Sequence, residues 1–338
     1  MNAPSETFRL AVLAELGYAP DHIEPGKLHR FTTCTKASDR AGWCKLFADE
    51  RGGVYGCNRS GMSGTWSAKD RASMTPAEHT AWRMQTEKAR REREFIQRRQ
   101  WAENGERNAR LWAACRDLVP GDPVTLYIKR RLLAPLWPVP LALRFHPALP
   151  YRHEGDLFGC FPAMVAAITN PAGELVALHR TWLSRDGQKA NVPGPGKKVT
   201  QASGPLIGGC VRLGAPMDGV IGVAEGVETA LAVSMASVVP TVAAYSAGAL
   251  AGWIWPADVR LLVIFADADK AGREAADRLR QRAQAAALRV SVLTPQEEGA
   301  DWCDVWAARD LPTTARTFDR LHDLETANRE GAGHDRND

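Results

Sequence analysis

The chain has 338 residues, of which 45% are hydrophobic, and this length and composition suit a globular protein of about two domains. It contains no run of about 20 apolar residues, and its first residues lack the basic and apolar pattern of a secretory signal, so we expect a soluble cytoplasmic protein with no membrane partner. The seven cysteines are odd in number and scattered, which argues against a disulfide framework and fits a reducing compartment.

The formal net charge of +4 conceals an asymmetry along the chain. Lys and Arg number 31 against 20 Asp and Glu before Ala215, and 12 against 19 from Ala215 onward. A basic body joined to an acidic module is typical of a protein that holds a polyanion with one part and performs metal chemistry on it with another. The alternative interpretation is that surface charge merely drifts between domains.

The first 67 residues are expected to form a small strand-rich module. Residues 5–17 (SETFRLAVLAELG) carry apolar residues at helical spacing, with Ser5 as the N-cap and Gly17 as the stop. Residues 27–67 contain short apolar runs separated by Gly, Asp and Ser turns, which predicts a small antiparallel sheet.

The same module contains four potential zinc ligands. A site of three cysteines and one histidine is conceivable, but zinc ribbons carry paired C-x2-C knuckles and this segment has none, so we favour a sheet without metal. The potential ligands are His29, Cys34, Cys44 and Cys57.

Aromatic and basic side chains in this module suit single-stranded nucleic acid, because bases stack on rings while cations hold phosphates. The alternative is that the rings are simply the core of a tiny domain. The rings are Trp43, Tyr55 and Trp66, and the cations are Arg30, Lys36, Arg40, Lys45, Arg51 and Arg59.

Residues 68–118 are densely charged and poor in glycine, which predicts one or two long helices. We interpret this segment as a charged helical linker. The alternative is a helix that also contacts the backbone of a nucleic acid.

Residues 119–214 predict a mixed α/β segment, with a helix near 122–133 followed by three strand-like runs. A Gly/Pro-rich loop, GQKANVPGPGKKVTQ, then holds three lysines. It is not a Walker A motif, because position 191 is Asn where the spacing requires Gly and position 198 is Lys where it requires Ser or Thr. The chain therefore encodes no ATPase motor, and any helicase would be a separate partner.

Residues 215–312 alternate apolar runs with helical patterns, and such alternation predicts an α/β domain with a Rossmann-like parallel sheet and crossover helices. Residues 313–338 form a polar tail, in which we expect fraying or disorder. The expected strands are 219–224, 240–244, 260–265 and 288–293.

Acidic residues follow three of these strands where each strand ends. Because the carboxyl ends of parallel strands meet at one edge of a sheet, these side chains predict a site for Mg²⁺ or Mn²⁺. The alternative is that they are helix N-caps and turn residues. They are Glu225, then Asp267 and Asp269, then Asp301 and Asp304.

The three acidic stretches AEGVETALA, FADADKAGREAADRL and GADWCDVW resemble, in order and spacing, the motifs of the Toprim domain, which primases, topoisomerases and some nucleases share. The preceding FPAMVAAITNPAGELVALHRTWLSRDGQKA is similar to the strand–turn–strand of the bacterial primase catalytic core. The N-terminal HRF…GW…GCNRSG…TW segment resembles the small modules of phage- and plasmid-borne Toprim primases.

The resemblance implies roles for particular residues. Glu225 would be a metal ligand or general acid/base, and Asp267 with Asp269 would be the metal-binding D-x-D pair. Asp304, with Asp301, would stand at the third acidic motif, where this chain departs from the pattern by carrying Ala at position 300 instead of Lys. The basic residues that would contact nucleotide or template are Arg180, Lys189, Lys197 and Lys198.

The resemblance further implies a DNA primase that uses nucleoside triphosphates and a single-stranded DNA template to make short RNA primers. Two alternatives remain open: a metal-dependent Toprim nuclease, and a replication accessory that binds single strands without catalysis. A topoisomerase is disfavoured, because none of the five tyrosines lies in the context of an active-site tyrosine on a large gate domain.

Overall fold

The computed structural model describes residues 3–34, 40–57, 62–69, 74–135, 138–237 and 239–308. The chain divides into two compact units, residues 1–99 and 100–338, which are described separately. Two of the expected N-terminal cations, Lys36 and Arg59, and the polar tail of residues 313–338 lie outside the described residues.

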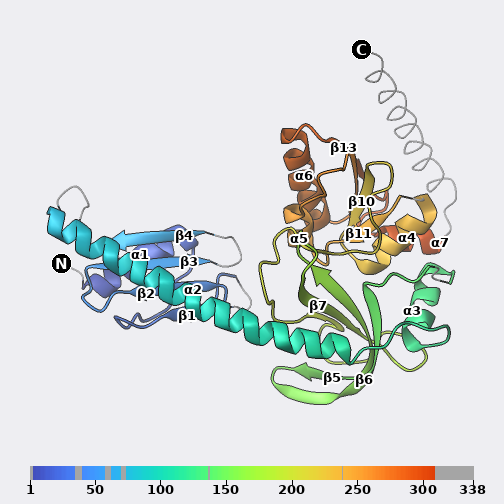
Figure 1. The fold of residues 1–338 in the computed structure, drawn as a ribbon, viewed down its shortest axis with the longest axis horizontal. Helices are drawn as coiled ribbons and strands as arrows, with labels where there is room; N and C mark the ends of the chain where they lie inside the picture. Colours follow the sequence, from blue (N-terminus) through green and yellow to red (C-terminus); the bar gives the residue numbers. More distant parts are fainter. Residues whose placement is uncertain are drawn as a thin grey trace, which may run out of the picture. The chain divides into compact units, whose positions relative to one another are not determined.

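The first unit is a four-stranded antiparallel sheet flanked by helices, as the sequence predicts (Figure 1). Neighbouring strands along the chain are neighbours in the sheet. Its elements are α1 (Pro4–Leu16), β1 (His29–Phe31), β2 (Gly42–Leu46), β3 (Gly52–Cys57), β4 (Ser63–Ser67) and the first part of α2 (Pro76–Ala113).

The start of α1 corrects one prediction. Ser5 is not the N-cap: the cap position lies two residues earlier, at Ala3, and no side chain caps the helix. Proline at the first helical position explains the shift, since its fixed φ suits the helix and its missing N–H needs no partner there. The predicted stop is confirmed, because Gly17 adopts the left-handed conformation and its N–H bonds the carbonyl of Leu13.

Two of the three rings that were expected to stack on bases are buried, and the third, Trp66, is partly buried against the Phe8 ring. Tyr55 lies in the core with Phe8, and Trp43 lies in a second cluster with Ala89 of α2. The guanidinium of Arg93 covers the Trp43 ring at 4.3 Å. For Trp43 and Tyr55, therefore, the interpretation as exposed rings is wrong and the core interpretation holds.

The charged segment expected to form one or two helices contains a single 38-residue helix, α2. Ion pairs within the helix support it, such as Glu87 with Arg90 at 3.0 Å and with Arg91 at 2.8 Å. None of the helices in the described part of the chain combines the length and apolar character needed to cross a membrane.

The second unit is built on one nine-stranded mixed sheet. Its strands are β5 (Leu143–His153), β6 (Asp156–Thr169), β7 (Leu175–Trp182), β8 (Lys197–Val199), β9 (Cys210–Val211), β10 (Val220–Ala224), β11 (Thr241–Ala243), β12 (Leu261–Phe265) and β13 (Arg289–Leu293). Its helices are the end of α2, α3 (Pro123–Leu132), α4 (Val227–Ser237), α5 (Ala247–Gly252), α6 (Lys270–Ala285) and α7 (Trp302–Ala308).

The sheet has a parallel half and an antiparallel half. Strands β13, β12, β10 and β11 are parallel neighbours, which confirms the predicted parallel core. Strands β5 to β8 form antiparallel pairs. The two-residue β9 joins the halves, because it pairs antiparallel with β11 on one side and with β6 on the other.

Different helices cover the two faces of the sheet, because side chains alternate along each strand. On one face, Val263 and Phe265 pack in a cluster with residues of α3, α4 and α7. On the other face, Leu262 and Ile264 pack with α5 and α6, while Trp182 of the antiparallel half packs with the end of α2. Both faces of the parallel strands are therefore buried, as their continuous apolar runs require.

We expect Leu279→Ala to lower the free energy of unfolding by about 2–5 kcal/mol, because the Leu279 side chain is fully buried between α6 and the sheet. Arg278→Ala, at an exposed position of the same helix, should change it by less than about 0.5 kcal/mol. Urea unfolding followed by circular dichroism measures both. Equal effects of the two variants would contradict this packing.

Candidate active site at the acidic edge of the sheet

The predicted acidic residues follow three strands that are neighbours in the sheet. Glu225 comes directly after β10, Asp267 and Asp269 follow β12, and Asp301 and Asp304 follow β13. Since β10, β12 and β13 are parallel and adjacent, all three groups lie at the same edge.

Asp267 lies at the centre of this group. Burial, and then the charges of Glu225, Asp301, Asp269 and Asp304, raise the pKa of Asp267 to about 7. One of its carboxylate oxygens, Oδ1, is buried and has no hydrogen-bond partner. Like charges therefore surround an oxygen to which no group in the described part of the chain donates a hydrogen bond.

The other four carboxylates also serve the local fold. Asp269 caps α6 by accepting a hydrogen bond from the N–H of Gly272 at 2.6 Å. Asp301 caps α7 by accepting from the N–H of Asp304 at 2.8 Å, and Asp304 accepts from the N–H of Asp301 at 3.3 Å. The carboxylate of Glu225 accepts from the backbone N–H of Ala247, where α5 begins.

Gly272 allows α6 to begin this close to the site. A Cβ atom at this position would lie 2.7 Å from the carbonyl oxygen of Asp267, nearer than any real Cβ contact. The glycine therefore permits a close approach of the chain to itself.

The chemistry of this group suits a divalent cation, which prefers carboxylate oxygens and would relieve the repulsion around Asp267. As they stand, however, no three of these side chains are placed to share one ion, and the same holds for every group of His, Cys, Asp or Glu within the described residues. The potential zinc ligands His29, Cys34, Cys44 and Cys57 are likewise not placed to share one ion. Burial raises the pKa of the Cys44 thiol to about 12, and His29 accepts a hydrogen bond from the backbone N–H of Glu24. The fit of a metal to the acidic edge therefore rests on the orphaned oxygen and the charge of the group.

A buried glutamate next to the acidic edge is held by a lysine and a tyrosine. Glu228 of α4 accepts hydrogen bonds from Tyr127 Oη at 2.7 Å and from Lys197 Nζ at 2.9 Å. Burial would raise the pKa of Glu228, but the charge and hydrogen bond of Lys197 and the hydrogen bond of Tyr127 outweigh it and hold the pKa at about 2. His179 lies beside this pair, and burial lowers its pKa to about 4.

The sequence reasoning missed this network, although a signal for it existed. Glu228 is a charged residue inside the run from Val227 to Val233, which is buried all round. Lys and Glu are almost never fully buried unless they are paired, so a glutamate in such a run implies a partner.

The predicted basic residues are divided between the two faces of the sheet. Lys197 points to the α4 face, where it pairs with Glu228, and its charge also lowers the pKa of Glu225. Arg180 and Lys198 are cross-strand neighbours on the opposite face, where both lie near the Trp182 ring. Lys189 lies on an exposed loop.

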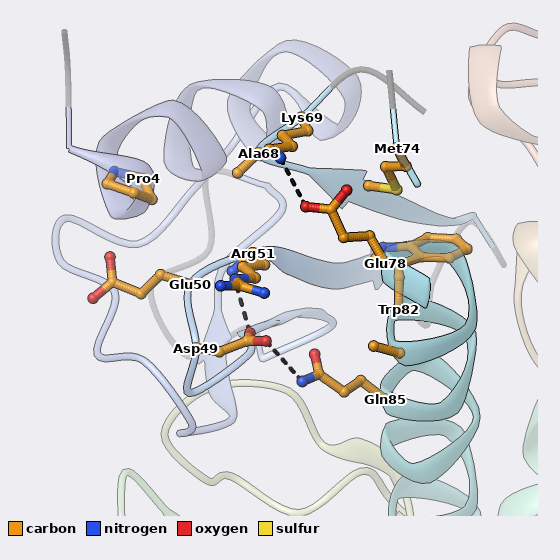
Figure 2. Close-up of a pocket in the computed structure, with 11 residues that line it drawn as sticks. Pro4, Asp49, Glu50, Arg51, Ala68, Lys69, Met74, Glu78, Trp82 and Gln85 are labelled. Atoms are coloured by element: carbon orange, nitrogen blue, oxygen red, sulfur yellow. Dashed lines mark hydrogen bonds and ion pairs between the residues drawn. The ribbon is translucent and has the colours of Figure 1, made fainter. Parts of the chain in front are cut away.

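The first unit contains a separate pocket of about 300 Å³ between the sheet and the start of α2 (Figure 2). Lys69 pairs with Glu78 at 2.7 Å, and Asp49 accepts a hydrogen bond from Gln85 at 2.8 Å. The lining holds three carboxylates, those of Asp49, Glu50 and Glu78, against the two cations of Arg51 and Lys69, so it has no excess of positive charge that would attract a phosphate.

The acidic edge lies in a segment that matches a known protein family. Residues 220–310 match the family model of the Toprim domain. This segment is a Toprim domain. Residues 102–213, which form the antiparallel half of the sheet with α3, match a family described as a domain of unknown function, DUF7146. Toprim domains generally bind Mg²⁺.

Solved primase structures show distant similarity to the chain. A DNA primase domain from Pseudomonas aeruginosa is 19% identical, over 48% of this chain and 52% of that one, with a TM-score of 0.34. The zinc-binding and RNA polymerase domains of the Aquifex aeolicus primase are 12% identical, over 99% and 90%, with a TM-score of 0.41. The RNA polymerase domain of the Mycobacterium tuberculosis primase DnaG is 18% identical, over 51% and 59%, with a TM-score of 0.33.

The chain thus spans about half the length of the Pseudomonas aeruginosa primase domain it matches. No similar sequence was found among curated proteins.

The raised pKa of Asp267 predicts a pH-dependent stability. Because the folded state binds its proton more tightly than the unfolded state, stability falls as pH rises from about 4 to 7. In EDTA, Asp267→Asn should therefore raise Tm at pH 8 by roughly 2–4 °C, with a smaller gain at pH 5. Differential scanning calorimetry measures this. Asp277→Asn, at an exposed position on α6, is the control, and the same gain at both pH values would contradict the crowding.

The buried hydrogen bond to Glu228 predicts the effect of removing the Tyr127 hydroxyl. Tyr127→Phe should lower the free energy of unfolding by about 1.5–3 kcal/mol, the range for a hydrogen bond to a charged group. Lys129→Ala, at an exposed position of the same helix, should be nearly neutral. Chemical denaturation compares the two; a neutral Tyr127→Phe would mean that the hydroxyl contributes nothing.

Proposed function

We propose that this protein is a primase-like nucleotidyltransferase that synthesises short RNA primers on single-stranded DNA. The 3′-hydroxyl of one nucleotide attacks the α-phosphate of the next, a new phosphodiester bond forms, and pyrophosphate leaves. The observation that carries the proposal is the crowding of carboxylates around Asp267 at the edge of a Toprim domain, with the cation of Lys197 beside them.

In this proposal, Glu225, Asp267, Asp269, Asp301 and Asp304 hold Mg²⁺ or Mn²⁺. When bound, the metal supplies neutralisation of the charge that develops on the transferred phosphoryl group. Asp267 is the residue best suited to be a ligand, because its buried oxygen has no other partner. Glu225 is the candidate general acid/base, since burial and then the charge of Asp269 raise its pKa.

Lys197 is the basic residue best placed to meet a triphosphate at this edge. Its ion pair with the buried Glu228 fixes the ammonium group near the carboxylates, while its side chain remains 38% exposed. Tyr127 and Glu228 are positioning residues in this scheme, because they act on the substrate through Lys197.

The remaining segments take supporting roles in the proposal. We assign catalysis to residues 119–214 and 215–312 together, linkage to residues 68–118, and contact with the template to the module of residues 1–67. An exposed cation such as Lys189 would add to template binding.

We expect the double variant Asp267→Asn, Asp269→Asn to lower template-directed oligonucleotide synthesis by about 100-fold or more, because metal ions supply several kcal/mol of charge stabilisation. Asn keeps the cap of α6, so the fold should persist. Labelled ribonucleotides with single-stranded DNA and Mg²⁺ or Mn²⁺ measure the product, and Asp277→Asn is the matched control.

Two outcomes would contradict this function. Synthesis by the double variant at the wild-type rate would remove the carboxylates from the reaction. Metal-dependent cutting of DNA by the wild type without nucleotides, together with no synthesis, would identify a Toprim nuclease.

A further inference from the structure

A second pocket lies on the face of the sheet opposite to Lys197. It has a volume of about 320 Å³, at the low end of the range for small-molecule sites. One wall is the end of α2 and the other is the segment from β8 to Gln201, with Arg180 of β7 between them. None of the residues that line it carries a negative charge.

The two walls are fixed to each other by buried amide side chains. Asn104 donates from Nδ2 to the carbonyl of Ala202 at 2.7 Å, and Asn108 donates to the carbonyl of Gln201 at 3.0 Å. Both asparagines are 3% exposed. Because buried polar side chains are costly unless bonded, these contacts indicate a preformed pocket that does not need a ligand to assemble.

Arg180 brings an uncompensated charge into this pocket. Its guanidinium lies 5.0 Å from the centre of the Trp182 ring and donates to the carbonyl of Val199 at 3.3 Å, while its Nε is buried without a partner. Within the described residues no carboxylate is paired with it, and burial lowers its pKa. A half-buried cation without a counter-charge is unfavourable by itself, and an anion would relieve it.

A second cation lines the pocket at its exposed side. Arg107 of α2 donates to the Oδ1 of Asn104, which fixes one edge of its guanidinium and leaves its other N–H groups to donate. Two guanidinium groups around one cavity match the oxygens of a phosphate, which they bind through paired hydrogen bonds.

We propose that this pocket, between the end of α2 and the β7–β8 pair, binds a phosphate group of a nucleotide or of a nucleic-acid strand. Arg180 and Arg107 hold the phosphate, and Asn104 and Asn108 keep the walls apart at a fixed distance. The site is distinct from the acidic edge, because none of the five carboxylates of that edge lines this pocket. It does not depend on the chemistry proposed for the Toprim domain.

Binding of inorganic pyrophosphate to the full chain in EDTA tests the site without metal chemistry. Pyrophosphate should raise the Tm of the wild type. Arg107→Ala, at an exposed position that leaves the fold intact, should weaken pyrophosphate binding by about tenfold, the effect of losing one charge-assisted contact. Arg110→Ala is the control, because this arginine is also exposed on α2 but does not line the pocket.

Arg180→Gln separates a binding role from a packing role. The site predicts that this variant loses the Tm rise with pyrophosphate. If Arg180 only packs on Trp182, the variant will have a lower Tm without ligand and the same rise with it. An undiminished rise in both Arg107→Ala and Arg180→Gln, or no rise in the wild type, overturns the proposal.

Two further probes in the same buffer identify the molecule whose phosphate is bound, a nucleic-acid strand or a free nucleotide. Fluorescence anisotropy of a labelled 12-nucleotide oligothymidylate should show weaker binding by Arg107→Ala, with a smaller salt dependence, if the ligand is a strand. If only ATP binding weakens and oligothymidylate binding does not change, the ligand is a free nucleotide. Since neither readout measures synthesis or cutting, failure of the proposed enzyme activity leaves this result unaffected.

Discussion

The second unit depends on the backbone pairing of β9, a strand of only two residues. Val211 pairs with Ala243 of β11 on one side and with Ile168 of β6 on the other. These few hydrogen bonds merge the antiparallel strands before Val211 and the parallel strands after it into one sheet. Without that junction, the DUF7146 segment and the Toprim domain would each expose a sheet edge, which folded proteins normally cover or pair. With it, Lys197 of one segment reaches Glu228 of the other.

Two carboxylates near the same edge have opposite protonation behaviour, and the cause lies in their donors. Glu228 is the more deeply buried, yet Lys197 and Tyr127 hold its pKa at about 2. Asp267 lacks a donor to one oxygen, so burial and then the surrounding like charges raise its pKa to about 7. Pairs of groups whose environments separate their pKa values are typical of sites that divide chemical and structural tasks. Here Glu228 keeps its charge and fixes Lys197, while the carboxyl group of Asp267 holds its proton up to a higher pH.

The sequence predicted those features that depend on local pattern. The strands of the Toprim domain could be identified because they are short apolar runs that alternate with helical patterns. The start of α1 could not be placed to the residue, since Pro4 and Ser5 both favour a helix start by different means. The burial of Trp43 could not be predicted either, because the sequence of a short strand is the same whether solvent or a helix covers its aromatic side chain.

The positions of the basic residues depend on strand pairing between distant parts of the chain, which the sequence does not reveal. Three of the four basic residues expected to act together, Arg180, Lys197 and Lys198, are divided between the two faces of the sheet, and the register of β7 with β8 decides which face each one occupies. In that register Arg180 stands opposite Lys198, so neither points to Glu228, whereas Lys197 does. A shift of one residue would exchange the two faces, and no local pattern in the loop before Lys197 specifies that register.

Four of the five acidic residues also stabilise the local fold, and this affects how related sequences are compared. Glu225, Asp269, Asp301 and Asp304 each accept a hydrogen bond at the start of a helix or beside it, so selection for folding alone would retain them. Asp267 has no such partner on Oδ1, and its charge opposes folding at neutral pH. A relative under selection for folding alone would be free to replace Asp267 first, and would become more stable by doing so. Under the proposed function, the residue at this one position therefore separates relatives that retain the metal site from those that retain only the fold.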